Sequence, residues 1–288
     1  MAVHPIRTLK NIFSRYKRKK QKKQKKIFAV ALGCGGAKGM AHLGVLQALE
    51  EEGISFDWYA GTSIGSVVGA LKAYGYATGE IKDAVLNICL KQYARYLRPY
   101  MDMGFVEEFL NGYLHETDFK GLKAPFYAWA TDKETVEGVL LEQGSVAHAC
   151  IASCAIPPYF HSVNVEGREL IDGVYTNPVP ADVLRRRGAD FVLGVDLNAA
   201  LPSDKNKKPH NVLTRVLSDT LDSTVKITPR PDALSRGYEA CNAVIRPPLD
   251  IFTPLDAAEG SLLEMYDIGY RTAKEQAAFI KRKIREIY

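Results

Sequence analysis

Two glycine-rich segments lie close together near the start of the chain, and they constrain the fold more than any other feature. The first is Gly33–Gly39, which reads Gly-Cys-Gly-Gly-Ala-Lys-Gly, and the second is Gly61–Gly65, which reads Gly-Thr-Ser-Ile-Gly. Each follows a short apolar run and precedes a segment with apolar residues at helical spacing. This repeated order of strand, glycine turn and helix is typical of an α/β protein with a parallel sheet.

Further apolar patterns continue this alternation along the chain. The pattern predicts strands at 27–32, 56–60, 125–131, 137–141 and 191–197, a hairpin of 163–165 with 169–171, and helices at 37–52, 64–74, 145–155 and 259–288. The aromatic-rich segment 80–115 is predicted to be mostly helical, and it either packs on the core or caps the functional site. No linker or internal repeat divides residues 27–288, so we expect one domain there.

Residues 1–26 differ from the rest of the chain in charge. They hold eleven Lys and Arg residues and no acid, while the whole chain has a net charge of +5, so the remainder carries −6. Apolar residues at roughly helical spacing precede the lysine run, which favours a basic amphipathic helix on an anionic membrane surface. The alternatives are a solvated tail and a tail that binds nucleic acid through its charge alone. The acidic body is not expected to bind nucleic acid specifically.

The cysteines and the hydropathy bear on the compartment. Five cysteines occur without a CxxC pair or metal-type spacing, which favours reduced thiols and no metal site. No apolar run approaches the roughly 18–20 residues of a membrane-spanning helix, and the N-terminus lacks the apolar core of a secretory signal. We expect a cytoplasmic protein, at most peripheral on the inner face of the membrane.

The second glycine segment fits a nucleophile elbow, in which Ser63 is lifted off the sheet edge between two glycines. Serine attacks a carbonyl only when a base accepts its proton and donors hold the oxyanion. The amides of Gly35 and Gly36, at the positive end of the following helix, are candidate donors. Lys38 either adds positive potential there or is solvated.

The first glycine segment also has an alternative interpretation. It partly fits a dinucleotide-binding fingerprint, with Asp57 about 20 residues further on to bind a ribose. Cys34 at the place of a motif glycine argues against this oxidoreductase hypothesis. A Walker loop is excluded, because no Gly-Lys-Ser/Thr follows at the required spacing.

Asp172 is the favoured base for Ser63. It ends a short apolar strand and precedes Gly173, so its carboxylate can face the edge that carries the elbow, although an ordinary Asp-Gly turn has the same sequence. With an unperturbed pKa of about 3.9, it must be partly desolvated to act as a base. His210 provides the alternative, because the order Ser63, Asp172, His210 matches an α/β-hydrolase triad.

Taken together with Ser153-Cys154-Ala155-Ile156-Pro157 and Asp172-Gly173, the glycine segments resemble the motifs of the patatin-like phospholipases. The similarity is clearest over residues 27–200 and weaker toward the C-terminus. It implies a three-layer α/β/α sandwich with a mainly parallel sheet, and a dyad of Ser63 and Asp172 without histidine. The implied oxyanion hole is Gly35, Gly36 and Lys38, with motif glycines Gly33, Gly39, Gly61, Gly65 and Gly173.

The same resemblance implies a reaction. It is the hydrolysis of fatty-acyl esters of phospholipids or lysophospholipids through an acyl-enzyme, with no metal or other cofactor. Where the family usually has an unbroken glycine run, this chain has Cys34. A positive φ there would strain the loop, so we expect that the Cys34 amide is not an essential donor. A catalytically inactive, membrane-associated scaffold with the same fold is the remaining alternative.

Overall fold

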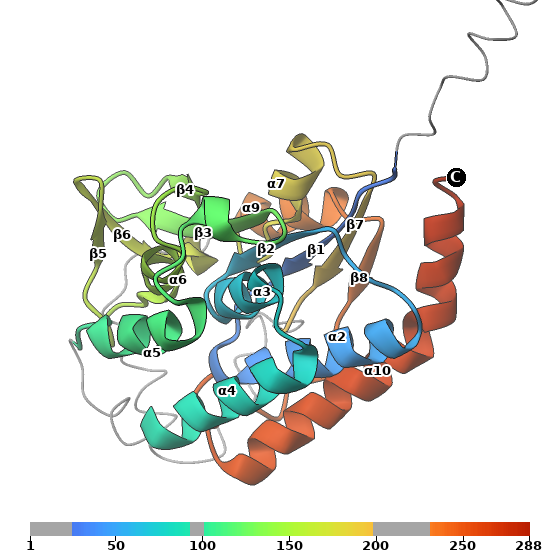
Figure 1. The fold of residues 1–288 in the computed structure, drawn as a ribbon, viewed down its shortest axis with the longest axis horizontal. Coiled ribbons are helices and arrows are strands. Elements are labelled where there is room, and N and C mark those ends of the chain that lie inside the picture. The colour runs from blue at the N-terminus through green and yellow to red at the C-terminus, as the bar shows by residue number, and fades with distance from the viewer. Residues whose placement is uncertain (1–24, 93–100, 198–230) are drawn as a thin grey trace, which may run out of the picture.

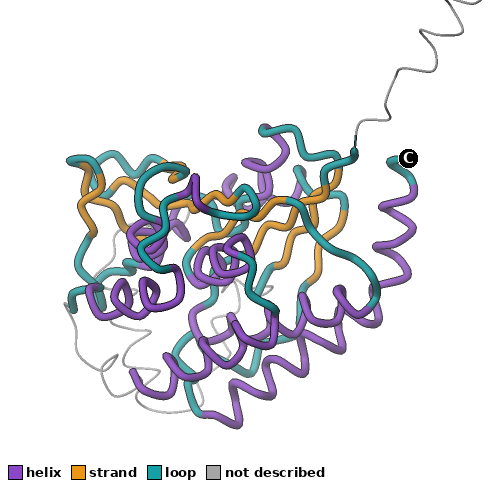
Figure 2. Tube along the Cα trace, viewed as in Figure 1, coloured by secondary structure: helices purple, strands orange, loops and turns teal. Residues whose placement is uncertain are grey.

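The computed structural model describes residues 25–92, 101–197 and 231–288. Its strands form one eight-stranded sheet, and helices cover both faces of that sheet (Figure 1). Figure 2 shows the strands as a central layer between helices. The predicted three-layer α/β/α architecture is confirmed.

The sheet is parallel in its centre and antiparallel at one end. The strand order is β5-β6-β3-β2-β1-β7-β8, with β4 also paired to β3. The pairs β1–β2, β1–β7, β2–β3 and β7–β8 are parallel. The pairs β3–β4, β3–β6 and β5–β6 are antiparallel. The strands are β1 Phe28–Leu32, β2 Trp58–Thr62, β3 Phe126–Asp132, β4 Gly138–Leu141, β5 Val163–Val165, β6 Arg168–Asp172, β7 Phe191–Val195 and β8 Ala243–Ile245.

The helices largely follow the predicted pattern. They are α2 Met40–Glu51, α3 Ile64–Tyr74, α4 Thr78–Gln92, α5 Gly104–Leu114, α6 Val146–Cys154, α7 Ala181–Arg186, α9 Pro231–Glu239 and α10 Glu259–Arg285, with short 3₁₀ turns η1 Gly36–Gly39, η2 Phe119–Gly121 and η3 Gly173–Tyr175. The helix predicted at 37–52 is therefore divided into η1 and α2. The segment 80–115 contributes α4 and α5, and its residues 93–100 lie outside the described part.

Alternating side chains of the central strands form a core on each face of the sheet. In β1, Val30 and Leu32 belong to the larger core, which also takes side chains from α2, α3 and α10. Ala29 and Ala31 point to the opposite face and pack with Leu184 of α7. This period of two, with both sets buried, is expected of a central parallel strand covered by helices on both faces.

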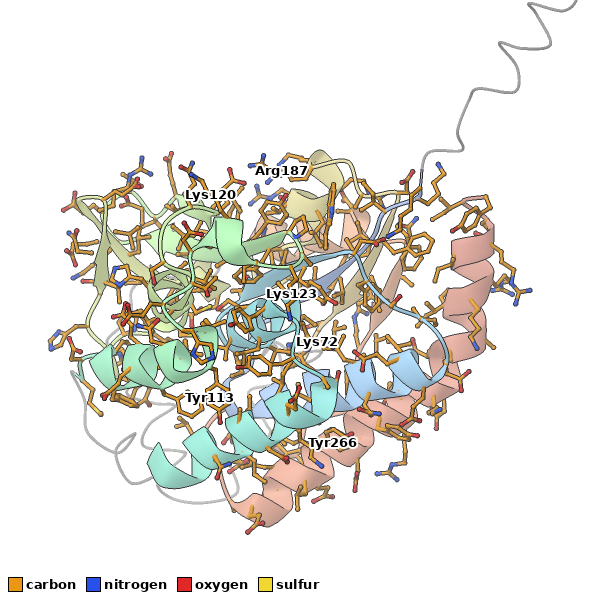
Figure 3. The ribbon with its side chains drawn as sticks, in the orientation of Figure 1. Lys72, Tyr113, Lys120, Lys123, Arg187 and Tyr266 are labelled. Atoms are coloured by element: carbon orange, nitrogen blue, oxygen red, sulfur yellow. The ribbon has the colours of Figure 1, made fainter. Side chains whose placement is uncertain are left out.

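The helices of the larger core are held together by polar contacts as well. The Lys72 ammonium of α3, labelled in Figure 3, lies 2.7 Å from Glu50 of α2 and 3.3 Å from the Thr78 hydroxyl of α4. The longest helix, α10, lies alongside α2 (Figure 1). Among the described helices, none combines the length and the apolarity needed to cross a membrane.

Candidate active site

Ser63 lies at the turn between β2 and α3. The strand ends at Thr62 and the helix begins at Ile64, so Ser63 alone makes the connection. Its backbone has φ 55° and ψ −130°, a conformation that residues with a Cβ rarely adopt. Such a conformation costs about 1–3 kcal/mol and persists only where the surroundings enforce it. The geometry is that of a sharp strand-to-helix elbow.

Close packing explains why glycines flank this turn. A Cβ built at Gly65 would lie 2.1 Å from the carbonyl oxygen of Leu32, the last residue of β1. One built at Gly61 would lie 2.2 Å from the carbonyl oxygen of Gly65. A side chain at either position would push α3 away from the sheet and carry Ser63 with it.

Two strands meet end to end on one side of β3, and their ends carry the two candidate catalytic residues. β2 runs parallel to β3, and its last residue, Thr62, pairs with Trp129. β6 runs antiparallel to β3, and its last residue, Asp172, pairs with Ala130. Residues 128–131 also pair with β4, which therefore occupies the opposite side of β3. The carboxyl ends of β2 and β6 thus face each other across one step of β3.

The side chains at this junction are hydrogen-bonded to each other. The Ser63 hydroxyl donates to Asp172 Oδ2 at 2.7 Å, and the Val174 backbone N–H donates to Oδ1 at 2.8 Å. The Asp172 side chain is buried, with 2% of the residue exposed. One carboxylate oxygen is held by the backbone, so the other is oriented toward the serine proton.

Burial changes the proton affinity of Asp172. Removal of the carboxylate from water raises its pKa from 3.8 to about 7, although both hydrogen bonds favour the ionised form. A carboxyl group with a pKa near 7 can accept a proton at neutral pH and return it later in a reaction. The desolvation that the sequence analysis required of Asp172 is therefore present.

The first glycine loop presents two backbone amides that donate to no atom in the described part of the chain. They belong to Gly35, the residue before η1, and to Gly36, the first residue of η1, which leads into α2. The neighbouring amides are engaged: Gly33 N–H donates to Val195 O at 2.9 Å, Cys34 N–H to Pro178 O at 3.1 Å and Ala37 N–H to Pro254 O at 2.8 Å. The unpaired amides lie at the positive end of α2, where an anion is stabilised.

The loop accommodates Cys34 without backbone strain. Cys34 is not among the residues with positive φ, and its N–H is used by the Pro178 carbonyl. Its amide is thus not free to act as a donor, in agreement with the expectation. Gly36, in contrast, requires glycine, because its φ is 56° and a Cβ there would lie 2.5 Å from the Pro254 oxygen.

Lys38 lies inside η1 with 9% of the residue exposed, so it is not simply solvated. Burial lowers its pKa, while the carboxylates of Asp250, Asp196 and Asp256 act in the opposite direction. Those carboxylates offset the positive charge that Lys38 brings to the loop. The amides of Gly35 and Gly36 are therefore the better candidates for holding an oxyanion, and Gly39 ends the turn directly after Lys38.

The histidine of the alternative triad is not in the described part of the chain, since His210 falls within residues 198–230. His42 of α2 is fully buried, and its Nε2 lies 2.7 Å from the carbonyl oxygen of Gly33. Burial lowers the pKa of His42 to about 4, so its ring is neutral at pH 7 and donates that bond. His42 thus supports the glycine loop from within the core.

The position of Asp57 contradicts the dinucleotide interpretation. Asp57 comes just before β2, accepts a hydrogen bond from Phe28 N–H at 3.0 Å and pairs with Lys25. The glycine loop follows the other end of β1, which is parallel to β2, so Asp57 lies at the opposite edge of the sheet. It cannot bind a ribose held by that loop. Within the described residues, no group of His, Cys, Asp and Glu is arranged to hold a metal ion.

Two features of the site were not predicted from the sequence. The hydroxyl of Ser153, on α6, accepts the Ser63 backbone N–H at 2.9 Å and donates to Trp129 O at 2.6 Å. The carbonyls of Pro178 and Pro254 bind the amides on either side of the unpaired pair. One indication of Ser153 was present in the sequence, which is its place in the motif Ser153–Pro157. No indication of the two carbonyls was present there, because their positions depend on long-range packing.

A family model matches the part of the chain that holds this site. The model described as patatin-like phospholipase matches residues 30–185. That range is more than half of the chain, and it includes both glycine segments, Ser63, Ser153 and Asp172.

Curated relatives resemble most of this chain but are longer. Human patatin-like phospholipase domain-containing protein 6 is 29% identical over 276 residues, which cover 85% of this chain and 20% of the human protein. An uncharacterized NTE family protein of Mycobacterium tuberculosis is 32% identical over 202 residues, which cover 68% of this chain and 56% of that protein. The chain thus spans about a fifth of the first relative and little more than half of the second.

Solved structures with a similar fold include one from a bacterium and one from human. VipD from Legionella pneumophila has a TM-score of 0.54 at 15% identity, covering 88% of this chain and 67% of VipD. Human GIVD cytosolic phospholipase A2 has a TM-score of 0.53 at 12% identity, covering 91% of this chain and 60% of the human chain. At such identities the likeness concerns the fold alone.

Proposed function

Because this chain belongs to the patatin-like phospholipase family, we propose that it is a serine hydrolase that cleaves fatty-acyl esters of phospholipids or lysophospholipids. The observation that carries the proposal is the 2.7 Å hydrogen bond from Ser63 to the buried Asp172, whose pKa is raised to about 7. A serine hydroxyl paired with a base that titrates near neutral pH is what acyl transfer requires.

The first half of the reaction forms an acyl-enzyme. Asp172 Oδ2 accepts the hydroxyl proton as Ser63 Oγ attacks the ester carbonyl carbon, and the carbonyl oxygen takes the negative charge. The tetrahedral intermediate then expels the alcohol, which is a lysophospholipid or a glycerophospho compound. The protonated Asp172 gives its proton to that leaving oxygen, so the enzyme retains only the acyl group.

The second half releases the fatty acid. A water molecule gives its proton to Asp172 and attacks the acyl carbonyl, and the collapse of the second intermediate returns the proton to Ser63 Oγ. The pKa of about 7 suits both directions of this transfer. No step requires a metal or an organic cofactor.

The oxyanion is assigned to the amides of Gly35 and Gly36, with Lys38 as a further, partly neutralised positive charge nearby. These amides lack partners among the described residues, so they need not break existing hydrogen bonds to bind an oxyanion. A donor of this kind contributes roughly 3–4 kcal/mol to the transition state. Two such donors would account for much of the rate that a weak carboxylate base cannot supply.

Fatty-acid release from defined lipids tests the proposal. We expect the wild-type protein to release fatty acid from phosphatidylcholine or lysophosphatidylcholine, measured by mass spectrometry, and to hydrolyse p-nitrophenyl butyrate. His210→Ala should keep the wild-type rate within about twofold, because Asp172 alone serves as the base. Loss of turnover in His210→Ala would favour the triad, and no release from any lipid would contradict the substrate class.

The inactive-scaffold alternative makes a separate prediction about the same samples. A fluorophosphonate probe reacts with an activated serine whether or not the right lipid has been found. Labelling of the wild-type protein at Ser63 would therefore exclude the scaffold, and absence of labelling would support it.

We further propose that residues 1–26 attach the enzyme to anionic membrane. Residues 1–26, here called the leader, join the rest of the chain, the body, at the start of β1, where Lys26 lies 2.9 Å from Asp190. This is the edge of the sheet opposite to Ser63, because β1 and β2 are parallel and Ser63 follows the far end of β2. A chain of 24 residues reaches at most about 80 Å, so the leader can tether the body without fixing the orientation of the site.

Deletion of residues 1–24 should weaken binding to phosphatidylserine-containing vesicles, most clearly at low salt. The deletion retains Lys25 and Lys26, whose partners are Asp57 and Asp190, so the start of β1 is preserved. Cosedimentation at two salt concentrations measures the effect, and hydrolysis of a soluble ester serves as the control for folding. Equal vesicle binding by the two forms would contradict the anchor.

We propose that the enzyme acts in the cytoplasm, on the inner face of the membrane, because its cysteines favour a reducing compartment. Cys150, Cys154 and Cys241 form no disulfide bond in the described part of the chain. Unpaired thiols persist in a reducing compartment. The partners that we assign are the phospholipid or lysophospholipid substrate and the anionic membrane surface. We assign no specific nucleic acid.

A further inference from the structure

Ser153 is a buried polar side chain for which the proposed reaction has no chemical step. It is the residue before the last in α6 and has no exposed surface. Its hydroxyl accepts the backbone N–H of Ser63 at 2.9 Å and donates to the backbone carbonyl of Trp129 at 2.6 Å. The hydroxyl thus links the first residue beyond β2 to the backbone of β3.

Trp129, whose carbonyl accepts the Ser153 hydroxyl, lies beside the backbone on both sides of the dyad. Trp129 pairs with Thr62, the residue before the nucleophile. A Cβ built at Gly173, the residue after the base, would lie 2.2 Å from the same carbonyl oxygen. The position of Asp172 relative to β3 is therefore set by direct packing. Ser63 lies beyond the end of its strand, and among the described residues it is the Ser153 hydroxyl that links the Ser63 amide to Trp129.

The backbone of Ser63 makes this link necessary. Its φ of 55° and ψ of −130° are unfavourable for a residue with a side chain. A buried N–H without an acceptor adds a desolvation penalty to that strain. Without the Ser153 hydroxyl, the peptide between Thr62 and Ser63 would gain from rotating toward another acceptor. Such a rotation would move Ser63 Oγ away from Asp172.

We propose that Ser153 is a positioning residue of the active site, whose hydroxyl holds the Ser63 backbone against Trp129 so that Ser63 Oγ stays within hydrogen-bonding distance of Asp172. The inference rests on the proposed function for the identity of the nucleophile. Ser153 does not transfer the proton or hold the oxyanion. It increases the fraction of molecules in which the dyad is aligned, so its removal acts on the acylation step and not on substrate binding.

Ser153→Ala tests this role through the labelling of Ser63 by a fluorophosphonate, which needs an aligned nucleophile but no lipid. We expect the maximal labelling rate to fall by about ten- to a hundredfold, the cost of one unsatisfied buried donor. The fluorophosphonate concentration that gives half of the maximal labelling rate should stay within about twofold of wild type. With p-nitrophenyl butyrate, kcat should fall by the same factor and KM should not change.

Cys150→Ala is the matched control. Cys150 lies one turn earlier on α6, is equally buried, and contacts Ser66 O at 3.5 Å instead of the Ser63 amide. Its substitution also deletes one buried heavy atom of the same helix, so it reproduces the loss of packing without the loss of the link. We expect it to be labelled within about twofold of the wild-type rate.

The outcomes separate the two proposals. Wild-type labelling by folded Ser153→Ala, or an equal loss in Cys150→Ala, would overturn the positioning role. If Ser153→Ala does not fold by circular dichroism, Ser153→Cys decides, because it retains the shape with a weaker hydrogen-bonding group and should still be slowed. A wild-type protein that is labelled but cleaves no lipid contradicts the proposed substrate and leaves the result for Ser153 intact. A wild-type protein that is not labelled at Ser63 contradicts both.

Discussion

Ser63→Ala should abolish ester hydrolysis, with kcat lower by about 10⁶-fold, the loss found when the nucleophile of a serine protease is removed. The residue supplies the only bond that the enzyme makes to the acyl carbon in the proposed reaction. Its hydroxyl donates a 2.7 Å hydrogen bond to the buried carboxylate of Asp172, the proposed base. The variant should also lose all fluorophosphonate labelling, which mass spectrometry of the labelled peptide measures directly.

Ser162→Ala is the matched control for this experiment. The Ser162 hydroxyl also donates to a carboxylate, that of Glu169 at 2.6 Å, but on the β5–β6 hairpin away from the elbow. Its removal should leave kcat and labelling unchanged. Residual labelling of Ser63→Ala at the wild-type rate would mean that another side chain is the nucleophile and would end the proposal for Ser63.

Local patterns account for the parts of the fold and of the site that were predicted. The helix at 64–74 was predicted with the bounds it has, because an apolar helical pattern lies between a glycine turn and Gly75. The hairpin before Asp172 was predicted from its turn residues, and β5 and β6 do pair there. Ser63 and Asp172 were each singled out by a neighbouring glycine and a preceding apolar strand. All of these signals lie within a few residues of the element they predict.

What the residues alone could not give is how distant elements meet. The contact of Ser63 with Asp172 depends on β2 and β6 ending on the same side of β3, which is a property of strand order and register. The apolar strand and the glycine next to Asp172 suggested that its carboxylate could face the edge that carries the elbow, and the family resemblance implied the dyad. The short strand β8 and the helices α7 and α9 were not predicted, because each carries too few periodic residues to stand out. The unpaired amides depend on carbonyls at Pro178 and Pro254, far away in sequence.

Asp172→Asn should lower kcat by about 10³- to 10⁴-fold while the protein remains folded. An amide retains an oxygen for the Val174 N–H, which donates at 2.8 Å in the wild type, but it cannot accept the proton of Ser63. The comparison is with Asp132→Asn, at the end of β3, whose carboxylate binds the backbone of its own turn and should have no effect on kcat. Activity within tenfold of wild type in Asp172→Asn would point to another base.

The pH dependence of the wild-type enzyme follows from the same carboxyl group. Only ionised Asp172 can accept the serine proton, and its pKa is raised to about 7 by burial. The value of kcat/KM should therefore rise about tenfold per pH unit below pH 7 and level off above it. The residual activity of Asp172→Asn should lack this step. A wild-type profile already flat at pH 5 would show that Asp172 has an ordinary carboxyl pKa.

The same burial should make Asp172→Asn the more stable protein at alkaline pH. Below about pH 3.8 the carboxyl group is protonated in both the folded and the unfolded chain and contributes nothing. Between 3.8 and about 7 the unfolded chain loses the proton while the folded chain keeps it, so the free energy of unfolding falls as pH rises. Above pH 7 the full difference corresponds to about 4 kcal/mol of lost stability.

The amide side chain introduced by Asp172→Asn does not titrate, so the advantage of this variant over the wild type in urea unfolding should grow from pH 5 to pH 8. Asp132→Asn should show no such trend, because backbone hydrogen bonds hold the pKa of Asp132 below its usual value of 3.8. Its carboxyl group is then ionised in both the folded and the unfolded chain from pH 5 to pH 8, so its contribution to stability is constant over that range. An active site whose base costs folding stability is expected where activity, and not stability, determines the residue. Equal unfolding free energies of wild type and Asp172→Asn at pH 8 would mean that the carboxylate is not desolvated. Burial would then not explain why Asp172 is basic enough to deprotonate Ser63.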